Sequence, residues 1–379
     1  MKSSNKNDLG LSLDEIDRYS RHLVLPEIGD SGQRKLKASS VLCIGCGGLG
    51  SPVLMYLASA GIGHIGIVDA DSVETSNLQR QVIHSTKWIG KPKTNSAKAR
   101  ILELNPHCKV ETFTKSLTNK NALEIIQSFD VICDCTDNFE SRYLINDACT
   151  ILGKPLAYGA ISKFEGQATV FNLKEESPNF RDLIPEPPPK ELLPSCSEAG
   201  VMGILPGLIG LIQATEIIKI ITGIGEPLNG RILVFDALKM KFKELKLVQS
   251  KDREPIKELI NYKEFCSKGI NSDSSIKNIS IGELNSLITN NASKIVILDV
   301  RTNNEFKISS IEKSISIPLE NILLGIDIEK IKKLSSEKKL YIYCQTGKRS
   351  IQAILTLKKH NINAVNILGG LESWKKRYS

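Results

Sequence analysis

A glycine-rich turn between two short apolar segments constrains the fold of this chain more than any other feature. The apolar segment Val41–Ile44 predicts a short buried strand, and Gly45-Cys-Gly-Gly-Leu-Gly50 follows in a G-x-G-x-x-G pattern. Ser51-Pro52 then opens a predicted helix, where proline is tolerated because its missing N–H would have no partner. A second strand over Ile65–Val68 ends at Asp69, so the segment predicts a dinucleotide-type α/β unit.

The glycines of this turn are candidates for nucleotide binding, with a purely structural tight turn as the alternative. They allow the backbone to approach phosphate oxygens, and the helix N-terminus adds N–H donors and partial positive charge. Asp69 can accept hydrogen bonds from ribose hydroxyls. The glycines assigned to this role are Gly45, Gly47, Gly48 and Gly50.

Basic residues beyond Asp69 indicate that the nucleotide is a triphosphate. Arg80 lies in the stretch Ser76-Asn-Leu-Gln-Arg80, and Lys93 starts a predicted helix that continues through Leu104. An enzyme that transfers hydride from nicotinamide does not need these cations. A site for a triphosphate needs them, because they neutralise its extra negative charge.

Two acidic residues close the next predicted strand, over residues 130–137. The carboxyl ends of parallel strands meet at one edge of a sheet, so Asp134 and Asp137 are expected near the same crevice. Their oxygens could hold Mg²⁺. A helix N-cap is the alternative role for Asp137.

A proline-rich loop over Ile184–Pro194 leads into Ser195-Cys-Ser-Glu-Ala-Gly200. A cysteine among small residues at the end of such a loop is placed to be exposed. A lone cysteine is more often an inert apolar side chain. The neighbouring motifs nevertheless favour a functional thiol at Cys196.

A change in composition separates a second domain from the first. Residues 1–248 form the first predicted domain, a polar and lysine-rich linker covers residues 249–278, and residues 279–379 form the second. In the second domain a predicted strand runs directly into Cys344-Gln-Thr-Gly-Lys-Arg-Ser350 and then a helix. Successive backbone N–H groups of such a loop bind anions and favour the thiolate form of Cys344.

The composition excludes several classes of function. The chain has 379 residues, a formal charge of +8 with scattered lysines, and 5% aromatic residues, so no nucleic-acid groove is expected. The most apolar segment, Val201–Thr222, contains Pro206, Glu216 and Lys219, which favours a buried or interface helix over a membrane span. Nine cysteines without paired spacing, and no apolar N-terminal signal, predict a cytoplasmic protein with thiol chemistry.

Residues 1–248 resemble the MoeB/ThiF family of E1-like adenylating enzymes. The resemblance predicts a Rossmann-like domain with a mostly parallel sheet and an antiparallel extension. It rests on Arg18-Tyr-Ser-Arg21, Gly45-Cys-Gly-Gly-Leu-Gly50, Asp69-Ala-Asp71, Ser76-Asn-Leu-Gln-Arg80, Lys93, Asp134-Cys-Thr-Asp-Asn138 and Cys196-Ser-Glu-Ala-Gly-Val-Met-Gly203.

The C-terminal part resembles an α/β rhodanese domain. The matching residues are Leu298-Asp-Val-Arg301, Glu305-Phe306, Ile317-Pro-Leu319, the Cys344 loop, Gly369-Gly370 and Trp374. An adenylating domain joined to a rhodanese domain is the architecture of sulfurylases that charge ubiquitin-like sulfur carriers. The combination is more specific than either motif set.

The resemblance implies an ATP- and Mg²⁺-dependent adenylation of the C-terminal Gly-Gly of a ubiquitin-like carrier protein. Arg21, Arg80 and Lys93 are the expected catalytic cations, and the family supplies the counterpart of Arg21 from a second subunit, which implies a homodimer. The expected ATP-binding residues are Gly45, Gly47, Gly48, Gly50, Asp69, Ser76, Asn77, Arg80, Lys93, Asp137 and Asn138, with Asp137 also positioning Mg²⁺.

The resemblance also implies a sulfur transfer. A donor such as a cysteine desulfurase would load Cys344 with a persulfide, whose terminal sulfur attacks the acyl-adenylate. Cys196 would release the carrier thiocarboxylate by forming a disulfide, or would first form a covalent acyl link. The sequence leaves both orders open.

The chain departs from the family at one expected metal site. The family usually holds a structural zinc with two Cys-x-x-Cys pairs. Here Asn179 and Asp182 stand at the first pair, and Lys251–Ile256 contains no cysteine at the second, so no structural zinc is expected.

In the rhodanese part, Ser309-Ser310 and Lys313 also differ from the family, and weaker packing is expected there. The loop has four residues between Cys344 and Arg349, where the related phosphatases have five. The shorter loop favours sulfur over phosphate.

Three alternatives to this interpretation remain. One is a nicotinamide-dependent Rossmann oxidoreductase fused to a sulfur-binding module, which would leave Arg80, Lys93 and Asp137 without a role. In another, the rhodanese part only docks partners, and in the third the enzyme adenylates a carboxylate on a tRNA base. The pathway served by the carrier (molybdopterin, thiamine or tRNA thiolation) also stays open.

Overall fold

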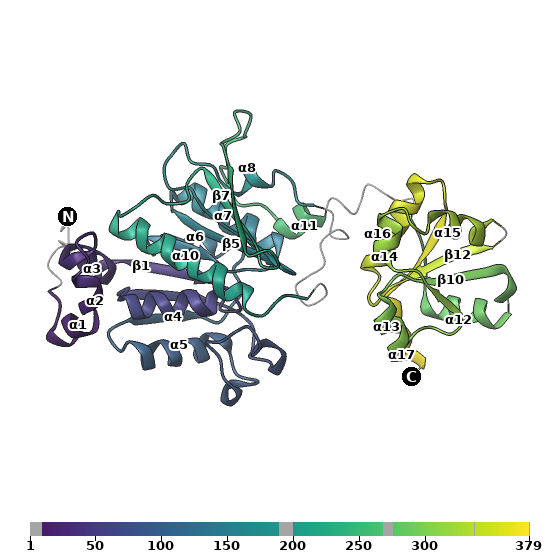
Figure 1. The fold of residues 1–379 in the computed structure, drawn as a ribbon, viewed down its shortest axis with the longest axis horizontal. Coiled ribbons are helices and arrows are strands. Elements are labelled where there is room, and N and C mark those ends of the chain that lie inside the picture. Colours follow the sequence, from purple (N-terminus) through teal and green to yellow (C-terminus); the bar gives the residue numbers. More distant parts are fainter. Residues whose placement is uncertain (1–9, 189–199, 268–275, 291, 337, 379) are drawn as a thin grey trace. The chain divides into compact units, whose positions relative to one another are not determined.

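The chain forms two compact units in the computed structural model (Figure 1). The structure describes residues 10–188, 200–267, 276–290, 292–336 and 338–378. The first unit extends to Phe265, past residue 249, where the expected linker begins, and the main part of the second unit starts at Cys266. Each unit has its own sheet and core.

An eight-stranded sheet with the order β3-β2-β1-β4-β5-β6-β7-β8 organises the first unit. The five strands from β3 to β5 are parallel, and β6, β7 and β8 add to them in antiparallel fashion. This confirms the predicted parallel sheet with an antiparallel extension. The strands are β1 (Ser40–Ile44), β2 (His64–Val68), β3 (Lys109–Phe113), β4 (Val131–Asp134), β5 (Leu156–Ser162), β6 (Glu165–Phe171), β7 (Arg231–Asp236) and β8 (Lys241–Lys246).

Helices cover both faces of this sheet, with α4, α5 and α10 on one and α6 and α7 on the other (Figure 1). The predicted helix over residues 13–23 is interrupted at Tyr19, whose ring packs against the turn at Gly61. The helices are α1 (Leu13–Arg18), α2 (Ser20–Leu23), α3 (Gly29–Ala38), α4 (Gly50–Ala60), α5 (Lys93–Leu104), α6 (Ala122–Gln127), α7 (Phe139–Leu152), α8 (Phe180–Leu183), α10 (Leu205–Thr222) and α11 (Tyr262–Ser267), with 3₁₀ turns η1 (Thr75–Asn77) and η2 (Thr86–Trp88).

The long apolar helix α10 packs against α4 and against strands β5 and β6. By length and composition it is the one helix among the described residues that could cross a membrane, and half of it is buried inside the unit. Its carboxamide and carboxylate side chains Gln213 and Glu216 are buried and hydrogen-bonded to backbone groups of the same unit. These contacts are those of a core helix in a folded domain.

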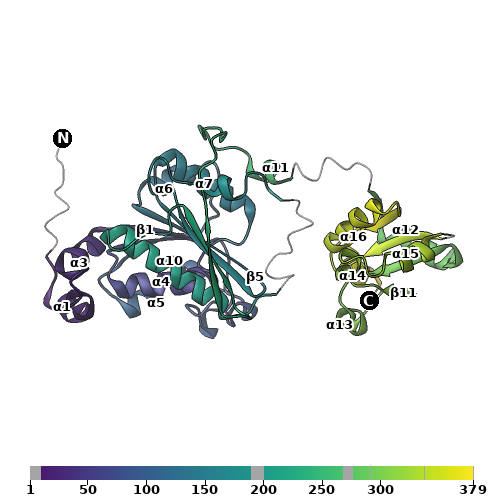
Figure 2. The same cartoon turned by 45° about the horizontal axis from the view of Figure 1, so that its top comes forward.

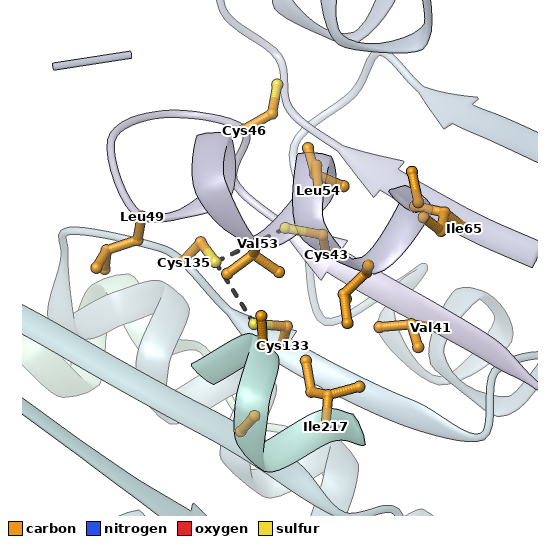
Figure 3. Packing of buried hydrophobic residues seen from close by; sticks show 14 of the residues in the cluster. Val41, Cys43, Cys46, Leu49, Val53, Leu54, Ile65, Cys133, Cys135 and Ile217 are labelled. Atoms are coloured by element: carbon orange, nitrogen blue, oxygen red, sulfur yellow. Dashed lines mark hydrogen bonds between the residues drawn. The ribbon is translucent and has the colours of Figure 1, made fainter. Parts of the chain in front are cut away.

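The core beneath the glycine turn contains a cluster of three cysteines (Figure 3). Cys43 on β1 and Cys133 on β4 are register partners, and both thiols lie within 3.7 Å of the Cys135 sulfur. Leu49, Val53 and other apolar residues of the turn and α4 pack around them. The small thiol side chains let the sheet and the turn come close together.

The second unit has a five-stranded parallel sheet with the order β11-β10-β12-β13-β9. Two separate apolar clusters cover its faces, one with residues of α14, α15 and α16 and the other with residues of α12 and α17. Figure 2 shows α12, α14, α15 and α16 around this sheet. This confirms the predicted α/β class. The strands are β9 (Lys277–Ile279), β10 (Ile295–Asp299), β11 (Ser314–Ser316), β12 (Lys339–Tyr343) and β13 (Ala364–Ile367), and the helices are α12 (Ile281–Asn290), η4 (Ala292–Lys294), α13 (Asn303–Ile308), α14 (Leu319–Leu323), α15 (Ile328–Ser335), α16 (Lys348–Lys359) and α17 (Gly370–Tyr378).

Candidate functional site

A cavity of about 240 Å³ lies at the carboxyl ends of β1, β2 and β4 in the first unit. This is the edge at which open parallel sheets bind their ligands. The cavity brings together residues that are far apart in the sequence. Of the predicted nucleotide-site residues it is lined by Gly45, Gly47, Gly48, Asp69, Arg80, Lys93, Asp137 and Asn138.

The four glycines of the turn have different physical roles. A Cβ on Gly45, which has a φ of +92°, would lie 2.8 Å from the Cys135 carbonyl oxygen, and one on Gly50 would lie 2.1 Å from the Gly45 oxygen. These two glycines permit close backbone packing. Gly47 and Gly48 both line the cavity; a Cβ on Gly47 would meet only the Gln81 side chain, at 3.5 Å, whereas one on Gly48 would lie 3.0 Å from Pro206 Cβ.

Cys46, the residue before Gly47, is held through both its backbone N–H and its carbonyl oxygen. Asp69 accepts a hydrogen bond from the Cys46 backbone N–H at 2.9 Å, and the Cys46 carbonyl lies 3.0 Å from His84 Nε2. His84 is buried and also contacts Ser96 Oγ at 3.0 Å. Burial lowers the pKa of His84, against the hydrogen bond to Cys46, so the ring favours its neutral form.

Lys93 and Arg80 bring positive charge to the cavity. The Lys93 side chain is 8% exposed, and its ammonium contacts Asp71, which is 71% exposed, at 2.8 Å. Burial opposes the charge on Lys93, but the hydrogen bond to Asp71 and the charge of Asp69 outweigh it and raise the pKa of the ammonium. Among the described residues, Arg80 donates to the Ser76 carbonyl alone, at 3.1 Å. Its guanidinium therefore keeps further donors for an anion.

The two acidic residues expected near Mg²⁺ differ in their surroundings. Asp134 is buried and accepts hydrogen bonds from the Thr136 N–H and hydroxyl, and burial raises the pKa of its carboxyl. Asp137 is exposed at the cavity. The N-cap of α7 is Asn138, whose side chain accepts from the Ser141 N–H. Asp137 therefore keeps its oxygens available for a hard cation beside phosphates.

Four of the residues predicted for ATP binding or adenylation do not line the cavity: Gly50, Ser76, Asn77 and Arg21. Ser76 and Asn77 form the turn η1, where Asn77 Oδ1 accepts from the Glu74 N–H at 3.2 Å. Arg21 is exposed on α2, next to Tyr19 at the C-terminal end of α4. The cavity lies at the N-terminal end of that helix, and its 11 residues span about 16 Å.

Other lining residues were not predicted from the sequence. Gln81 is buried, its Oε1 has no hydrogen-bond partner among the described residues, and it faces the cavity next to Gly47. Arg142 on α7 is buried between Phe139 and Tyr158 and donates to the Thr136 carbonyl. Ser116, Leu117, Ser141 and Ile161 complete the wall.

The Cys344 loop starts at the carboxyl end of β12 in the second unit. The Gly347 N–H donates to the Cys344 sulfur at 3.1 Å, and Gly347 has a φ of +108° that favours glycine. Gly370 lies close behind the loop, because a Cβ there would be 2.3 Å from the Cys344 carbonyl oxygen. Cys344 itself is buried. The loop thus holds the Cys344 sulfur against the Gly347 backbone N–H.

Two ion pairs frame this loop. Arg349 donates to both Glu305 oxygens at 2.8 and 2.7 Å, which lowers the pKa of Glu305 to about 2 against the opposing effect of burial. Arg301 pairs with Asp299 and also donates to Gln345 Oε1 at 3.2 Å. The side chain of Lys348 and the residue Cys196 lie outside the described residues.

The comparisons with known proteins agree with this arrangement. Residues 19–256 match the ThiF family, and residues 280–377 match the rhodanese-like domain. The chain therefore belongs to the ThiF family and carries a C-terminal rhodanese-like domain. This confirms the resemblance found in the sequence.

Full-length relatives share both parts. The chain is 43% identical to the "probable adenylyltransferase/sulfurtransferase MoeZ" of Mycobacterium tuberculosis, over 97% of this chain and 94% of that protein. It is 40% identical to the "adenylyltransferase and sulfurtransferase MOCS3" of Drosophila virilis, over 96% of this chain and 84% of that protein. A "probable molybdopterin-synthase adenylyltransferase" of Porphyra purpurea is 42% identical over 96% of this chain and 94% of that protein.

Solved structures share the fold of the first unit. The crystal structure of E. coli MccB with MccA-N7isoASN covers 67% of this chain and 77% of that chain, at 21% identity and a TM-score of 0.58. The structure of E. coli MccB with ATP covers 63% of this chain and 74% of that chain, at 23% identity and a TM-score of 0.56. At these identities the likeness concerns the fold.

Proposed function

We propose that this chain is an adenylyltransferase and sulfurtransferase that converts the C-terminal carboxylate of a ubiquitin-like sulfur carrier into a thiocarboxylate. One observation carries the proposal: a cavity with glycine, acidic and basic residues suited to ATP and a rhodanese-type cysteine loop occur on the same chain. Relatives that match nearly the whole chain bear names for both activities.

The first half-reaction forms an acyl-adenylate on the carrier. The Gly-Gly carboxylate attacks the α-phosphorus of ATP, and the bond to pyrophosphate breaks. Negative charge develops on phosphate oxygens, which Lys93 and Arg80 stabilise, while Asp69 receives the ribose. Mg²⁺, held through Asp137, would neutralise further phosphate charge.

The second half-reaction transfers sulfur. The terminal sulfur of a Cys344 persulfide attacks the acyl carbon, AMP leaves, and an acyl disulfide links the carrier to Cys344. In one order, the Cys196 thiolate attacks the Cys344 sulfur, the carrier leaves as a thiocarboxylate, and a Cys196–Cys344 disulfide remains for a thiol reductant. In the other order, Cys196 first accepts the acyl group from the adenylate as a thioester, before the persulfide attacks.

Mass spectrometry of the carrier tests this function. Recombinant ubiquitin-like proteins ending in Gly-Gly are incubated with the full chain, ATP, Mg²⁺ and a cysteine desulfurase with cysteine. The expected result is replacement of one oxygen by sulfur at the C-terminus of a carrier, with pyrophosphate release that depends on that carrier. Tight binding of a nicotinamide dinucleotide without ATP turnover would contradict the proposal.

We also propose that Arg21 acts in the cavity of a second copy of this chain. An apolar cavity of about 320 Å³ lies next to α2, lined by His22 and by residues of α4 and α10 such as Tyr56, Leu211 and Ile218. Tyr56 and Leu211 are exposed large apolar side chains. A two-fold dimer through this face would cover Tyr56 and Leu211. It would also place Arg21 of one copy beside the second copy of the chain.

Mixing of two inactive variants tests this arrangement. Arg21→Ala and Asp137→Ala each disable adenylation, but a hybrid dimer contains one cavity with both intact residues. Equal mixing with subunit exchange should restore about a quarter of the wild-type rate, because half of the dimers are hybrids with one intact site each. No recovery in a mixture that does exchange subunits would contradict an Arg21 supplied by the partner.

We also propose a reducing cytoplasmic location, which is supported by the eight described cysteines, all of which are free thiols. The pathway that uses the carrier is left to the mass-spectrometric experiment.

A further inference from the structure

A buried serine hydroxyl lies next to the reactive sulfur of the second unit. Ser350, on the first turn of α16, is fully buried, and its Oγ lies 3.9 Å from Cys344 Sγ. The same hydroxyl lies 2.8 Å from the Gly347 carbonyl oxygen and 2.7 Å from Asn366 Oδ1. A serine hydroxyl has one hydrogen to donate, so three acceptors compete for it.

One of these acceptors is an asparagine in the interior of a strand, where apolar residues are the usual choice. Asn366 lies in β13 between Val365 and Ile367, and all three residues are buried. Its Nδ2 donates at 2.9 Å to Oδ1 of Asn278, the register partner of Asn366 on β9. This bond leaves Asn366 Oδ1 for Ser350, so a buried acceptor is held beside the hydroxyl.

The backbone of the cysteine loop is fixed by the start of α17. The Leu371 N–H donates to the Cys344 carbonyl at 2.9 Å, and the Glu372 N–H donates to the Gln345 carbonyl at 3.0 Å. These bonds satisfy the first two carbonyl oxygens of the loop. The Gly347 N–H donates to the sulfur itself at 3.1 Å.

The cations beside the loop are already paired. The guanidinium groups of Arg301 and Arg349 both bind carboxylates. Neutral donors close to Cys344 Sγ therefore add to the stabilisation of a negative charge on this atom, and the Ser350 hydroxyl is placed to be one of them.

We propose that the Ser350 hydroxyl is a switchable hydrogen-bond donor for the Cys344 sulfur. While the sulfur is neutral, the hydroxyl hydrogen lies toward Asn366 Oδ1 or the Gly347 carbonyl, which are nearer. When Cys344 is a thiolate, the hydrogen turns toward the sulfur, because a hydrogen bond to an ionised acceptor is stronger than one to a neutral acceptor. Ser350 keeps its proton in both states, and only the torsion of its hydroxyl changes.

This switch acts in the loading of Cys344 with sulfur. The inference rests on the proposed function in one respect, namely that Cys344 accepts sulfur as a persulfide. In this step the Cys344 thiolate attacks the outer sulfur of a donor persulfide, a new S–S bond forms, and the donor cysteine leaves as a thiolate. The negative charge then lies on the terminal sulfur, and the hydroxyl returns to its other acceptors. Asn366 and Asn278 are thus positioning residues that provide the alternative acceptor.

Three variants of the full chain test this role. Ser350→Ala removes the hydroxyl, and Ser350→Thr keeps it. Thr356→Val is the matched control, because Thr356 lies on the same helix and donates only a local bond to the Gln352 carbonyl, at 3.0 Å, among the described residues. Each variant is measured for alkylation of Cys344 by iodoacetamide between about pH 5 and pH 10, for persulfide loading by a cysteine desulfurase with cysteine, and for melting temperature. Mass spectrometry of the Cys344 peptide follows the first two reactions, because the chain contains nine cysteines.

The switch predicts an effect that depends on charge. In Ser350→Ala the alkylation rate should fall about fivefold at the pH values where Cys344 is partly protonated, because one hydrogen bond to the thiolate is lost. At high pH, where every molecule carries the thiolate, the rate should equal that of the wild type. Loading with sulfur should slow by a similar factor at the lower pH values, and Ser350→Thr should recover part of the loss. Thr356→Val should behave as the wild type, and carrier-dependent pyrophosphate exchange should not change in any variant.

Two results would overturn the switch. One is an alkylation profile and a loading rate of Ser350→Ala equal to those of the wild type, which would leave the hydroxyl a purely structural role. The other is an equal fall at every pH, which would indicate a displaced loop rather than a lost donor. If the added methyl group of Ser350→Thr lowers its melting temperature below that of the assay, the comparison of Ser350→Ala with Thr356→Val decides. Alkylation needs neither ATP nor a carrier, so its outcome is separate from the proposed function, which fails if the wild-type chain produces no thiocarboxylate.

Discussion

The nucleotide cavity and the Cys344 loop both accommodate negative charge, but their cations and backbone groups are arranged differently. Each lies where a parallel strand ends and a glycine-containing turn begins, so backbone N–H groups are available for an anion in both. In the first unit the turn borders an open cavity, and Arg80 keeps donors free for a ligand. In the second unit the loop closes around Cys344, and Arg301 and Arg349 are already paired with carboxylates.

This difference separates a site for a large ligand from a site for a single atom. The cavity has space for a nucleotide. Its cations can change partner, because Lys93 contacts Asp71, whose side chain is largely exposed. In the cysteine loop Arg301 and Arg349 are paired with carboxylates, and the Cys344 side chain is buried. The two half-reactions should therefore respond to different substitutions.

The largest effect is expected at the cysteine loop. Cys344→Ala removes the nucleophile and should abolish thiocarboxylate formation while pyrophosphate exchange continues. Cys108→Ala, at another buried thiol of the chain, is the control and should retain both reactions. Thiocarboxylate formation by Cys344→Ala would mean that the second unit only docks a partner, and the comparison of two chemical sites would fail.

Substitutions in the nucleotide cavity should lower adenylation and leave the loading of Cys344 with sulfur unchanged. Lys93→Ala should lower pyrophosphate exchange by about 10²- to 10³-fold, because a preorganised cation near the transferred phosphate is lost. Persulfide loading of Cys344 by a cysteine desulfurase should not change. Lys91→Ala, two residues away and positioned over the Trp88 ring, is the matched control with an expected normal rate. A similar loss of pyrophosphate exchange and of persulfide loading would show that the nucleotide cavity and the Cys344 loop are coupled.

His84 should affect ATP binding by fixing the conformation of the glycine turn, without taking part in the chemistry. It fixes the Cys46 carbonyl, and with it the orientation of the N–H of Gly47, a residue that lines the cavity. His84→Ala should raise the KM for ATP about tenfold with a smaller effect on kcat. His84→Gln, which can keep a donor near Cys46, should show a smaller rise in KM, and equal KM values in both variants would contradict this role.

The smallest effect is expected on stability at low pH. The folded-state pKa of Glu305, about 2, lies below its usual value of 4.5, so the ion pair with Arg349 stabilises the second unit above pH 4.5. This contribution is lost as the pH falls from 4.5 toward 2. Because Glu305 is 34% exposed and screened by solvent, Glu305→Gln should cost only about 1 kcal/mol of unfolding free energy at pH 7.

Urea unfolding at several pH values measures this contribution. The difference between wild type and Glu305→Gln should shrink at low pH, since the wild-type carboxyl becomes neutral as well. A difference that grows toward pH 3 would contradict the assigned ion pair.

Local patterns made much of this molecule predictable. The glycine turn, Asp69, Lys93 and Asp137 are recognisable because each stands at the end of an apolar strand or the start of a helix. Gln81 and Arg142 were missed because nothing near them in sequence distinguishes them from surface residues, and the folded chain buries them.

Long-range pairing explains the remaining differences. A polar, lysine-rich stretch has the composition of a linker, and only the folded chain brings Arg253 to Asp182 and Tyr262 to Asp147. The predicted roles of Ser76, Asn77 and Arg21 in nucleotide binding remain predictions, since these side chains do not line the cavity of their own chain.

The burial of the cysteines has a consequence for the handling of reactive sulfur. The chain contains nine thiols, and the seven described ones other than Cys344 are all buried. Burial raises the pKa of Cys46 and Cys149, and that of Cys108 to about 12, which keeps these thiols protonated and poorly nucleophilic. A persulfide formed at Cys344 is thereby protected from exchange with Cys46, Cys108 and Cys149, which are buried and protonated.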